Sequence, residues 1–238
     1  DGLVHDNKVT LVGHSLGAGV ASLYASCFPE QVEQLILLDG ASFLARDAKD
    51  TPMHVRNHIQ RRLVVQQQQQ TQKTAKQTKG FPSLEAAIAR RLQSIQSFPG
   101  NQTLSYETAR AMVLRATHLD DGDLPVVSNL PDDDFSSQII QFRHDRRYAW
   151  PSIQYMTQDQ IEGIFRGLVH VDCCILLAEN GWPFQQEQID RAVELIQPQM
   201  IQQLPGSHYF HADPDHYSSV AKAIQQFLNR KLDRSKGI

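Results

Sequence analysis

A serine between two glycines is the residue whose setting points most directly to chemistry. Ser15 is the centre of Gly13-His14-Ser15-Leu16-Gly17, a G-x-S-x-G pattern. An apolar run ends just before this pattern, and small and apolar residues with the spacing of a helix follow it. Strand, sharp turn and helix in this order predict a nucleophile elbow, in which the serine hydroxyl stands clear and can attack a carbonyl carbon. The alternative is a glycine-rich turn without chemistry.

The neighbours of the serine have expected roles of their own. We expect Gly13 and Gly17 to be needed because a Cβ at either position would collide with the adjoining strand or helix. The Leu16 N–H lies at the amino end of the predicted helix, so it can donate to an oxyanion. His14 either lines the substrate pocket or packs inside the elbow, and we favour packing.

A serine becomes nucleophilic only when a base takes its proton, so a histidine must come from elsewhere in the chain. His208 fits because it follows the last predicted strand and precedes the last predicted helix. His211 lies closer to the start of that helix, so we favour His208. For either residue, the alternative is a loop histidine with a structural hydrogen bond.

The acid that would orient the histidine has two candidates. Glu179 follows the penultimate predicted strand, which is the usual place for such an acid. Asp39 follows the strand after the elbow, at a carboxyl end of the sheet, where ligand sites of α/β folds collect. We favour Asp39 and keep Glu179 as the alternative. A structural aspartate at the start of a loop would also fit position 39.

A dense group of polar residues near the carboxyl end could suggest a metal site. Its members are His208, His211, Asp213, Asp215 and His216. Asp213 followed by Pro214 is better explained as the start of a helix, and no recognised ligand spacing is present. We therefore expect no metal and no cofactor.

A parallel sheet is needed to bring these residues together. Strand, helix and strand in this order predict a βαβ unit and hence an α/β fold. We expect four mainly parallel strands in chain order, with the first at an edge. They are Lys8–Val12, Val32–Leu38, Val171–Ala178 and Met200–Leu204. The core helices are expected at 15–28, 187–197 and 213–232.

A long insertion separates the second strand from the third. We predict core segments at 1–40 and 168–238, and a helical cap over 41–167. The cap should contain helices over 51–76 and 103–118, another capped by Ser83, and a last one over 157–168. The glutamine run 66–70 is read as the polar face of the first helix rather than as a disordered tract. An acidic loop over 120–134 and a connector over 141–151 complete the insertion.

Composition excludes several classes of partner. The chain has 238 residues, a hydrophobic content of 41% and a formal net charge of −3, without the basic stripe of a nucleic-acid binder. No run approaches the length of a membrane span, so we expect neither nucleic acid nor membrane as partner. The three cysteines read as buried free thiols in a reducing compartment. We therefore expect a cytoplasmic protein, with the peroxisome as the alternative.

Three stretches together resemble a known family. Gly13-His14-Ser15-Leu16-Gly17, followed by F-P-E-Q-V-E-Q-L-I-L-L-D, is similar to the α/β-hydrolase superfamily. F-R-H-D-R-R-Y-A-W-P-S and P-G-S-H-Y-F-H-A-D-P are similar to the serine hydrolase-like (kraken-like) group. The resemblance implies that Ser15 is the nucleophile, His208 the base and Asp39 the acid. It also implies strands before the elbow and a second oxyanion donor that precede residue 1, so we expect an N-terminally truncated chain.

These observations predict a serine hydrolase of the α/β-hydrolase fold. We expect cleavage of a small-molecule ester or related acyl substrate through Ser15, His208 and Asp39, by way of an acyl-enzyme. The alternative is a ligand-binding protein on the same fold without catalysis, because a fold does not by itself establish a function.

Overall fold

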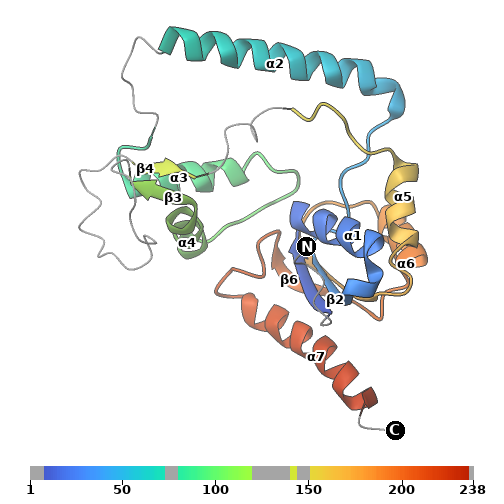
Figure 1. Ribbon diagram of the computed structural model, residues 1–238. Coiled ribbons are helices and arrows are strands. Elements are labelled where there is room, and N and C mark those ends of the chain that lie inside the picture. Colours follow the sequence, from blue (N-terminus) through green and yellow to red (C-terminus); the bar gives the residue numbers. More distant parts are fainter. Residues whose placement is uncertain (1–7, 73–79, 120–139, 144–150, 236–238) are drawn as a thin grey trace. The chain divides into compact units, whose positions relative to one another are not determined.

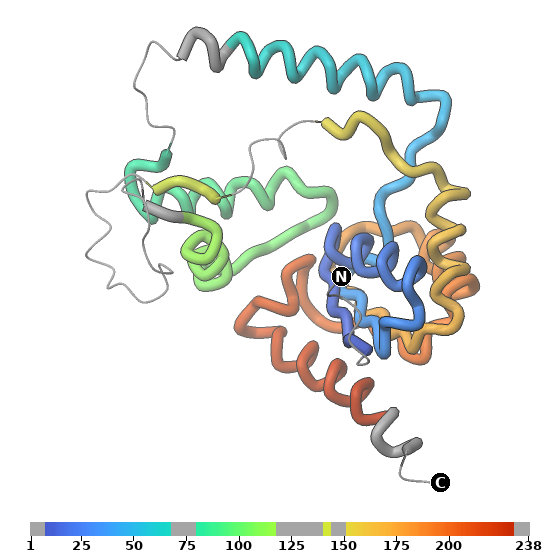
Figure 2. Tube along the Cα trace, viewed as in Figure 1, coloured from blue at the N-terminus to red at the C-terminus, as the bar shows by residue number. Residues whose placement is uncertain are grey.

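The computed structural model describes residues 8–72, 80–119, 140–143 and 151–235. The chain divides into two compact units. The core unit comprises Asp1–Ala45, Phe98–Thr103 and Met156–Ile238, and the insert unit comprises Arg46–Ser97 and Leu104–Tyr155. Figure 2 shows that the core unit joins the blue amino-terminal part of the chain to the orange and red carboxyl-terminal part. Residues far apart in sequence can therefore meet in one site.

A parallel sheet of four strands forms the centre of the core unit. The strands are β1 (Val9–His14), β2 (Val32–Leu38), β5 (Asp172–Asn180) and β6 (Met200–Ser207), arranged in the order β1-β2-β5-β6. The predicted α/β fold and strand order are confirmed. In the middle of the sheet, Leu35 is in register with Leu11 of β1 and with Cys173 of β5. The second half of β2, Leu35–Leu38, is a continuous apolar run because both faces of the strand are covered there.

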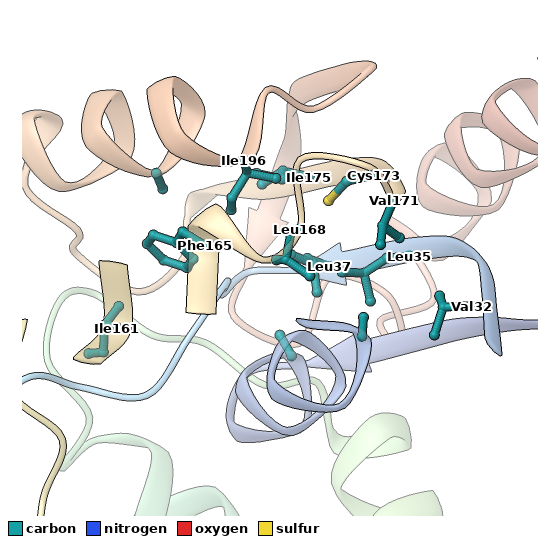
Figure 3. Close-up of a cluster of buried hydrophobic side chains, with 13 residues drawn as sticks. Val32, Leu35, Leu37, Ile161, Phe165, Leu168, Val171, Cys173, Ile175 and Ile196 are labelled. Carbon is teal, nitrogen blue, oxygen red and sulfur yellow. The ribbon is translucent and has the colours of Figure 1, made fainter. Parts of the chain in front are cut away.

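Alternate residues of β2 point into two different apolar clusters. Leu35 and Leu37 belong to the cluster under helices α1 (Leu16–Cys27), α5 (Gln158–Arg166) and α6 (Gln186–Ile196), which Figure 3 shows. Ile36 and Leu38 belong to the cluster that includes Phe227 of helix α7 (Tyr217–Ser235). The two-residue period of a strand thus divides the core between the two faces of the sheet. In Figure 1, α7 lies apart from the group formed by α1, α5 and α6.

Among the described strands, β1 is an edge, as predicted. Val9 and Val12 of β1 remain 46% and 55% exposed. Pro29–Gln31 forms a short 3-10 helix that leads from α1 into β2. A second turn of this kind, Ala48–Asp50, precedes the first helix of the insert unit.

Helices α5 and α6 are joined by an ionic contact. Thr157 begins α5 with a complete capping box, as a sequence of this type predicts. Glu162 of α5 accepts from Arg191 of α6 at 2.5 Å and from Arg166 at 2.8 Å. The hydrogen bond from Arg191 lowers the pKa of Glu162 to about 2, so this carboxylate stays ionised. The helix that follows the insertion is thereby held to the helix that precedes β6.

The insert unit is built mainly from helices. Its elements are α2 (Thr51–Gln72), α3 (Leu84–Ile95), α4 (Tyr106–Ala116), β3 (Thr117–Leu119) and β4 (Ile140–Phe142). Ile88 of α3 and Val113 of α4 share a small apolar cluster with Ile140. Ser83 caps α3 by accepting from the Ala86 N–H at 3.1 Å, as predicted. The glutamine run 66–70 lies within α2, in agreement with the helical interpretation.

Several boundaries differ from those predicted. β3 and β4 pair antiparallel inside the insertion, where no strand was expected. The sequence did not predict them because a strand of three residues is too short to show an alternation of apolar and polar side chains. β6 continues through Pro205, which an edge strand tolerates because the missing N–H leaves no partner unpaired. Asp213 does not begin the last helix: its side chain accepts from the Asp215 N–H in a turn, and α7 starts at Tyr217.

The predictions for the cysteines and for the loops of the insertion have mixed outcomes. Cys27 is exposed, whereas Cys173 and Cys174 are buried as expected. Cys27 lies at the end of α1, outside the cluster that buries the opposite side of that helix. The acidic loop 120–134 and positions 144–150 of the connector lie outside the described residues. In the described part of the chain, no helix combines the length and the apolar character needed to cross a membrane.

Candidate active site

Ser15 occupies a strained turn between β1 and α1. Its backbone angles are φ 55° and ψ −121°, which residues with a side chain rarely adopt. The Ser15 N–H donates to the Leu38 carbonyl at 3.0 Å, and its own carbonyl accepts from the Ala18 N–H at 2.9 Å. A Cβ at Gly13 would lie 2.5 Å from the carbonyl oxygen of Gly17. The turn therefore has the geometry of the predicted elbow and needs a glycine at position 13.

Gly17 does not have the role that was expected of it. A Cβ at this position meets no described atom within 4 Å, so the expected collision is absent. Gly17 lies in the first turn of α1 and is exposed, on a side of the helix that no described element covers. Among the described residues, only Gly13 of the pattern lies so close to neighbouring backbone that a side chain would collide.

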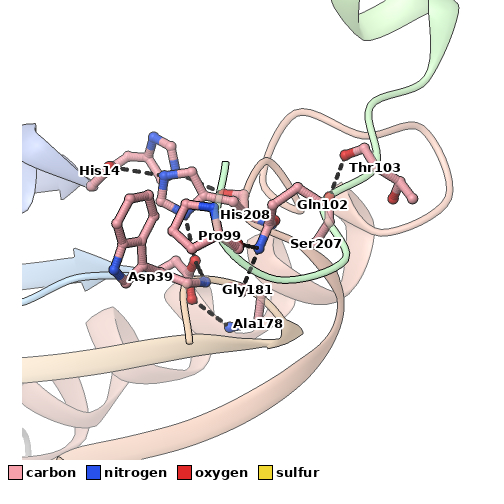
Figure 4. Close-up of polar contacts among 11 residues, drawn as sticks. His14, Asp39, Pro99, Gln102, Thr103, Ala178, Gly181, Ser207 and His208 are labelled. Atoms are coloured by element: carbon pink, nitrogen blue, oxygen red, sulfur yellow. Dashed lines mark hydrogen bonds and ion pairs between the residues drawn. The ribbon is translucent and has the colours of Figure 1, made fainter. Parts of the chain in front are cut away.

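His208 lies between Ser15 and Asp39. Its Nε2 is 2.8 Å from Ser15 Oγ, and its Nδ1 is 2.5 Å from Asp39 Oδ2. A carboxylate oxygen only accepts, so Nδ1 carries the proton and Nε2 accepts from the serine hydroxyl. The predicted hydrogen bond between Ser15 and His208 is present, across 193 positions of sequence. Figure 4 shows Asp39 and His208 facing each other.

Asp39 is held by strand β5 and by the loop that follows it. It has φ 45° and is 2% exposed at the end of β2. Its Oδ1 accepts from the Ala178 N–H at 3.1 Å, and its Oδ2 accepts from the Trp182 N–H at 2.8 Å. These bonds compensate for the burial of a carboxylate and fix its orientation toward His208.

Glu179, the alternative acid, is exposed near the end of β5, and the Nδ1 partner of His208 is Asp39. The chain around Glu179 instead contributes the Ala178 and Trp182 N–H groups that hold Asp39. In the same way, it is His208 and not His211 that contacts Ser15. The structure thus brings together Ser15, His208 and Asp39 and leaves both alternatives outside this set.

His14 packs against the loop that carries His208. Its Nε2–H donates to the His208 carbonyl oxygen at 2.7 Å. Its ring centroid lies 4.6 Å from that of His208 and 4.1 Å from that of His211. Burial, followed by the neighbouring His211 and His208, lowers the pKa of His14 to about 3. His14 is therefore neutral at ordinary pH and acts as a hydrogen-bond donor inside the elbow, as the packing interpretation predicts.

Aromatic rings surround the histidine, and sequence reasoning did not anticipate them. The ring centroids of Phe98, Trp182 and Tyr209 lie 6.2, 5.8 and 5.2 Å from that of His208. Tyr209 follows His208 directly, but Phe98 and Trp182 come from distant loops, and no local pattern marks them. The rings limit the space in which the imidazole can turn and reduce its contact with water.

Leu16 is the first residue of α1, so its N–H has no acceptor within the helix and lies beside Ser15. This is the position expected of an oxyanion donor. Within the described residues, no group of three or more His, Cys, Asp or Glu side chains could hold a metal ion. Asp213, from the dense polar group, instead accepts from His216 Nδ1 at 3.3 Å.

An apolar pocket lies elsewhere in the core unit, between α5, α6 and the segment that follows Asp39. Phe43, Ile161 and Phe184 are among its lining residues. Ser15 and His208 are not among the described residues that line it. The lining does include Gly40, where a Cβ would lie 3.2 Å from the Ser15 carbonyl oxygen, so the pocket begins close to the elbow.

Comparison with known proteins gives the same fold. The family model described as alpha/beta hydrolase fold matches residues 3–209. A serine hydrolase-like protein of Dictyostelium discoideum is 25% identical over 234 residues, covering 95% of this chain and 57% of the relative. Human serine hydrolase-like protein 2 is 24% identical, covering 92% of this chain and 66% of the relative. The chain thus spans 57% to 66% of the length of these two relatives.

Solved structures agree in fold. A hypothetical protein of Pseudomonas aeruginosa PAO1 superposes with a TM-score of 0.71 at 23% identity, covering 94% of this chain and 68% of that one. A thioesterase domain from the curacin biosynthetic pathway has a TM-score of 0.54 at 19% identity, with coverages of 94% and 66%. An esterase of M. tuberculosis has a TM-score of 0.54 at 14% identity, with coverages of 94% and 62%. At these identities the likeness concerns the fold alone.

Proposed function

This chain belongs to the α/β-hydrolase fold family, and on that premise we propose that it is a serine hydrolase that cleaves a carboxylic ester or a related acyl substrate. The observation that carries the proposal is the continuous hydrogen-bonded series from Asp39 through His208 to Ser15, with distances of 2.5 and 2.8 Å. The orientation of each group suits acyl transfer, because the serine faces the accepting nitrogen and the carboxylate faces the donating one.

Acylation begins when His208 Nε2 takes the proton of the Ser15 hydroxyl. The Ser15 oxygen attacks the carbonyl carbon of the substrate, and the Leu16 N–H donates to the oxyanion that develops. Asp39 stabilises the positively charged imidazole while the tetrahedral intermediate exists. The intermediate collapses, the leaving group takes the proton from His208, and the acyl group remains on Ser15.

Deacylation repeats these steps with water. His208 takes a proton from water, which attacks the acyl carbon, and the proton then returns to Ser15 as the carboxylic acid leaves. No step requires a metal or a cofactor. Mechanisms that begin with a carboxylate nucleophile do not apply to this elbow, because its central residue is Ser15.

The structural neighbours support the class of substrate. They include a thioesterase domain and an esterase, both of which act on acyl compounds by name. We therefore propose a small-molecule ester or thioester as substrate. Separately, we propose a cytoplasmic location, in keeping with three cysteines that are all free thiols.

A serine-directed fluorophosphonate probe tests the proposal. We expect covalent labelling at Ser15, identified by mass spectrometry of the labelled peptide, and no labelling of Ser15→Ala. The control is Ser42→Ala, because the Ser42 hydroxyl donates to the Phe43 carbonyl and takes no part in the series. Labelling should persist in that variant. An unlabelled protein with an intact fold would instead favour a ligand-binding role for the same site.

A further inference from the structure

A short segment between α3 and α4 lies against the site. Phe98–Thr103 belongs to the core unit, although the chain on both sides of it belongs to the insert unit. Within this segment, Gln102 contacts the two loops that hold the base and the acid. Its Oε1 accepts from the His208 N–H at 3.0 Å, and its Nε2 donates to the Gly181 carbonyl at 2.6 Å. Figure 4 shows Gln102 with its partners Gly181 and His208.

A carboxamide is the side-chain group suited to this position. The His208 N–H needs an acceptor, and the Gly181 carbonyl needs a donor. The amide of Gln102 supplies one acceptor, Oε1, and one donor, Nε2, on the same carbon atom. These two partners also determine which atom of the amide is oxygen and which is nitrogen, because the opposite orientation would place like groups together. A carboxylate of the same shape could accept from His208 but could not donate to Gly181.

The segment itself is fixed in place. Gln102 Nε2 also donates to the Pro99 carbonyl at 3.1 Å, which closes the segment on itself. The Ser207 hydroxyl donates to the Thr103 carbonyl at 2.6 Å, and Ser207 directly precedes His208, which Gln102 contacts. Phe98 lies with its ring centroid 6.1 Å from that of Trp182. Gln102 therefore projects from a backbone that is attached to β6 and to the loop after β5.

The loop after β5 is the loop that positions the acid. Gly181 lies next to Trp182, whose N–H holds Asp39 Oδ2. Gln102 thus links the backbone of His208 to Gly181. The residue after Gly181, Trp182, binds the Asp39 carboxylate, and that carboxylate contacts His208. This closes a ring of contacts through Gln102, Trp182, Asp39 and His208, and a shift of either loop would be opposed by the other.

The geometry points to Gln102 as a positioning residue of the triad, which holds the loop of His208 in register with the loop after β5 that binds the Asp39 carboxylate. This inference rests on the proposed function for its effect on catalysis. It concerns the geometry of His208 and Asp39, however, and that geometry can be measured without any substrate. Gln102 touches no reacting atom, so its replacement should lower the rate of the chemical step and leave substrate affinity nearly unchanged.

Gln102→Leu, which keeps the size of the side chain but removes both bonds, is the test. In wild-type protein with ¹⁵N-labelled histidine, the proton between His208 Nδ1 and Asp39 should give a resonance far downfield, identified by its absence from Asp39→Asn. We expect Gln102→Leu to weaken or move that resonance. We also expect kcat with a p-nitrophenyl ester to fall about 10- to 100-fold, the range for a small misplacement of catalytic groups, with little change in KM.

Two further variants keep the test decisive. Gln96→Leu makes the same replacement at an exposed position and should match the wild type. Gln102→Glu retains the acceptor for the His208 N–H, loses the donor to Gly181, and serves if Gln102→Leu does not fold. An unchanged resonance in a folded Gln102 variant would overturn the inference. A wild-type protein that shows the resonance but does not react with the fluorophosphonate would refute the proposed function, while the resonance of the variants would still decide the role of Gln102.

Discussion

Gly181 lies directly against the carboxylate of Asp39. A Cβ built on Gly181 would overlap both carboxylate oxygens, so this position admits no side chain while Asp39 faces His208. The close approach arises because the loop after β5 wraps around the aspartate to donate the Trp182 N–H. The orientation of the acid thus depends on the absence of a side chain on a different loop.

Gly181→Ala should therefore reduce activity as well as stability. The added methyl group must displace the carboxylate of Asp39 or the loop, and we expect kcat/KM to fall about 100-fold, as for other displacements of about 1 Å in an active site. The free energy of unfolding should fall by about 1–3 kcal/mol, the range for overpacking. Ester hydrolysis and urea unfolding measure the two effects. Gly163→Ala on α5 is the control, because its Cβ meets no described atom within 4 Å; equal activity of the two variants would contradict the argument.

Asp39→Asn should nearly abolish turnover. The amide can present an NH₂ group to His208, which favours the tautomer that cannot accept the serine proton. We expect kcat to fall about 10⁴-fold, the magnitude found when a triad acid is replaced in this way. Initial rates with a p-nitrophenyl ester measure the loss. Glu179→Gln makes the matching change at the exposed carboxylate and should leave kcat close to that of the wild type. A large loss in Glu179→Gln would return the role of the acid to that residue.

His14 should make the protein less stable as pH falls below about 6.5. Its pKa in the folded protein is about 3, against an ordinary value of 6.5, because it is buried beside His211 and His208. The unfolded chain then binds a proton that the folded chain does not, so unfolding becomes easier between these two pH values. At pH 5 the loss attributable to His14 is about 2 kcal/mol.

His14→Phe removes that titrating group and keeps a ring in the stack. Urea unfolding between pH 7 and pH 5 should show a smaller decline in the free energy of unfolding for His14→Phe than for the wild type. Part of the decline should remain, because burial also lowers the pKa of His211. Parallel pH profiles for the two proteins would contradict this, because they would show that His14 binds its proton equally in the folded and unfolded states.

The three thiols should differ in reactivity toward a disulfide reagent such as DTNB. Cys27 is exposed and should react quickly in the folded protein. Burial raises the pKa of both Cys173 and Cys174, so neither should form a thiolate at neutral pH. We expect one fast thiol per chain in buffer and three in denaturant, and Cys27→Ser should remove the fast reaction. Any fast thiol in that variant would mean that β5 is accessible.

The contact between Ser15 and His208 could be predicted from the sequence because the signals of both residues are local. The elbow is a strand, a turn and a helix within a few residues, and the strain at Ser15 together with the close packing at Gly13 leaves a pattern in adjacent positions. His208 could be assigned from its place between the last strand and the last helix. The parallel sheet followed from the apolar run of β2 and the order of strands and helices, which reflect hydrogen bonding and burial along the chain.

Only the tertiary structure showed that Asp39 rather than Glu179 contacts His208, because this depends on which loop meets the histidine and not on the residue type. The pairing of β2 between β1 and β5 brings the end of β2 beside the elbow, where the Ala178 and Trp182 N–H groups bind the carboxylate of Asp39. Gln102 lies 106 positions from His208 in sequence and carries no local signal, since an isolated glutamine in a loop looks like any other surface residue. Its two bonds exist only because the chain returns from the insertion to the core at that point, which is a property of the folded backbone rather than of neighbouring residues.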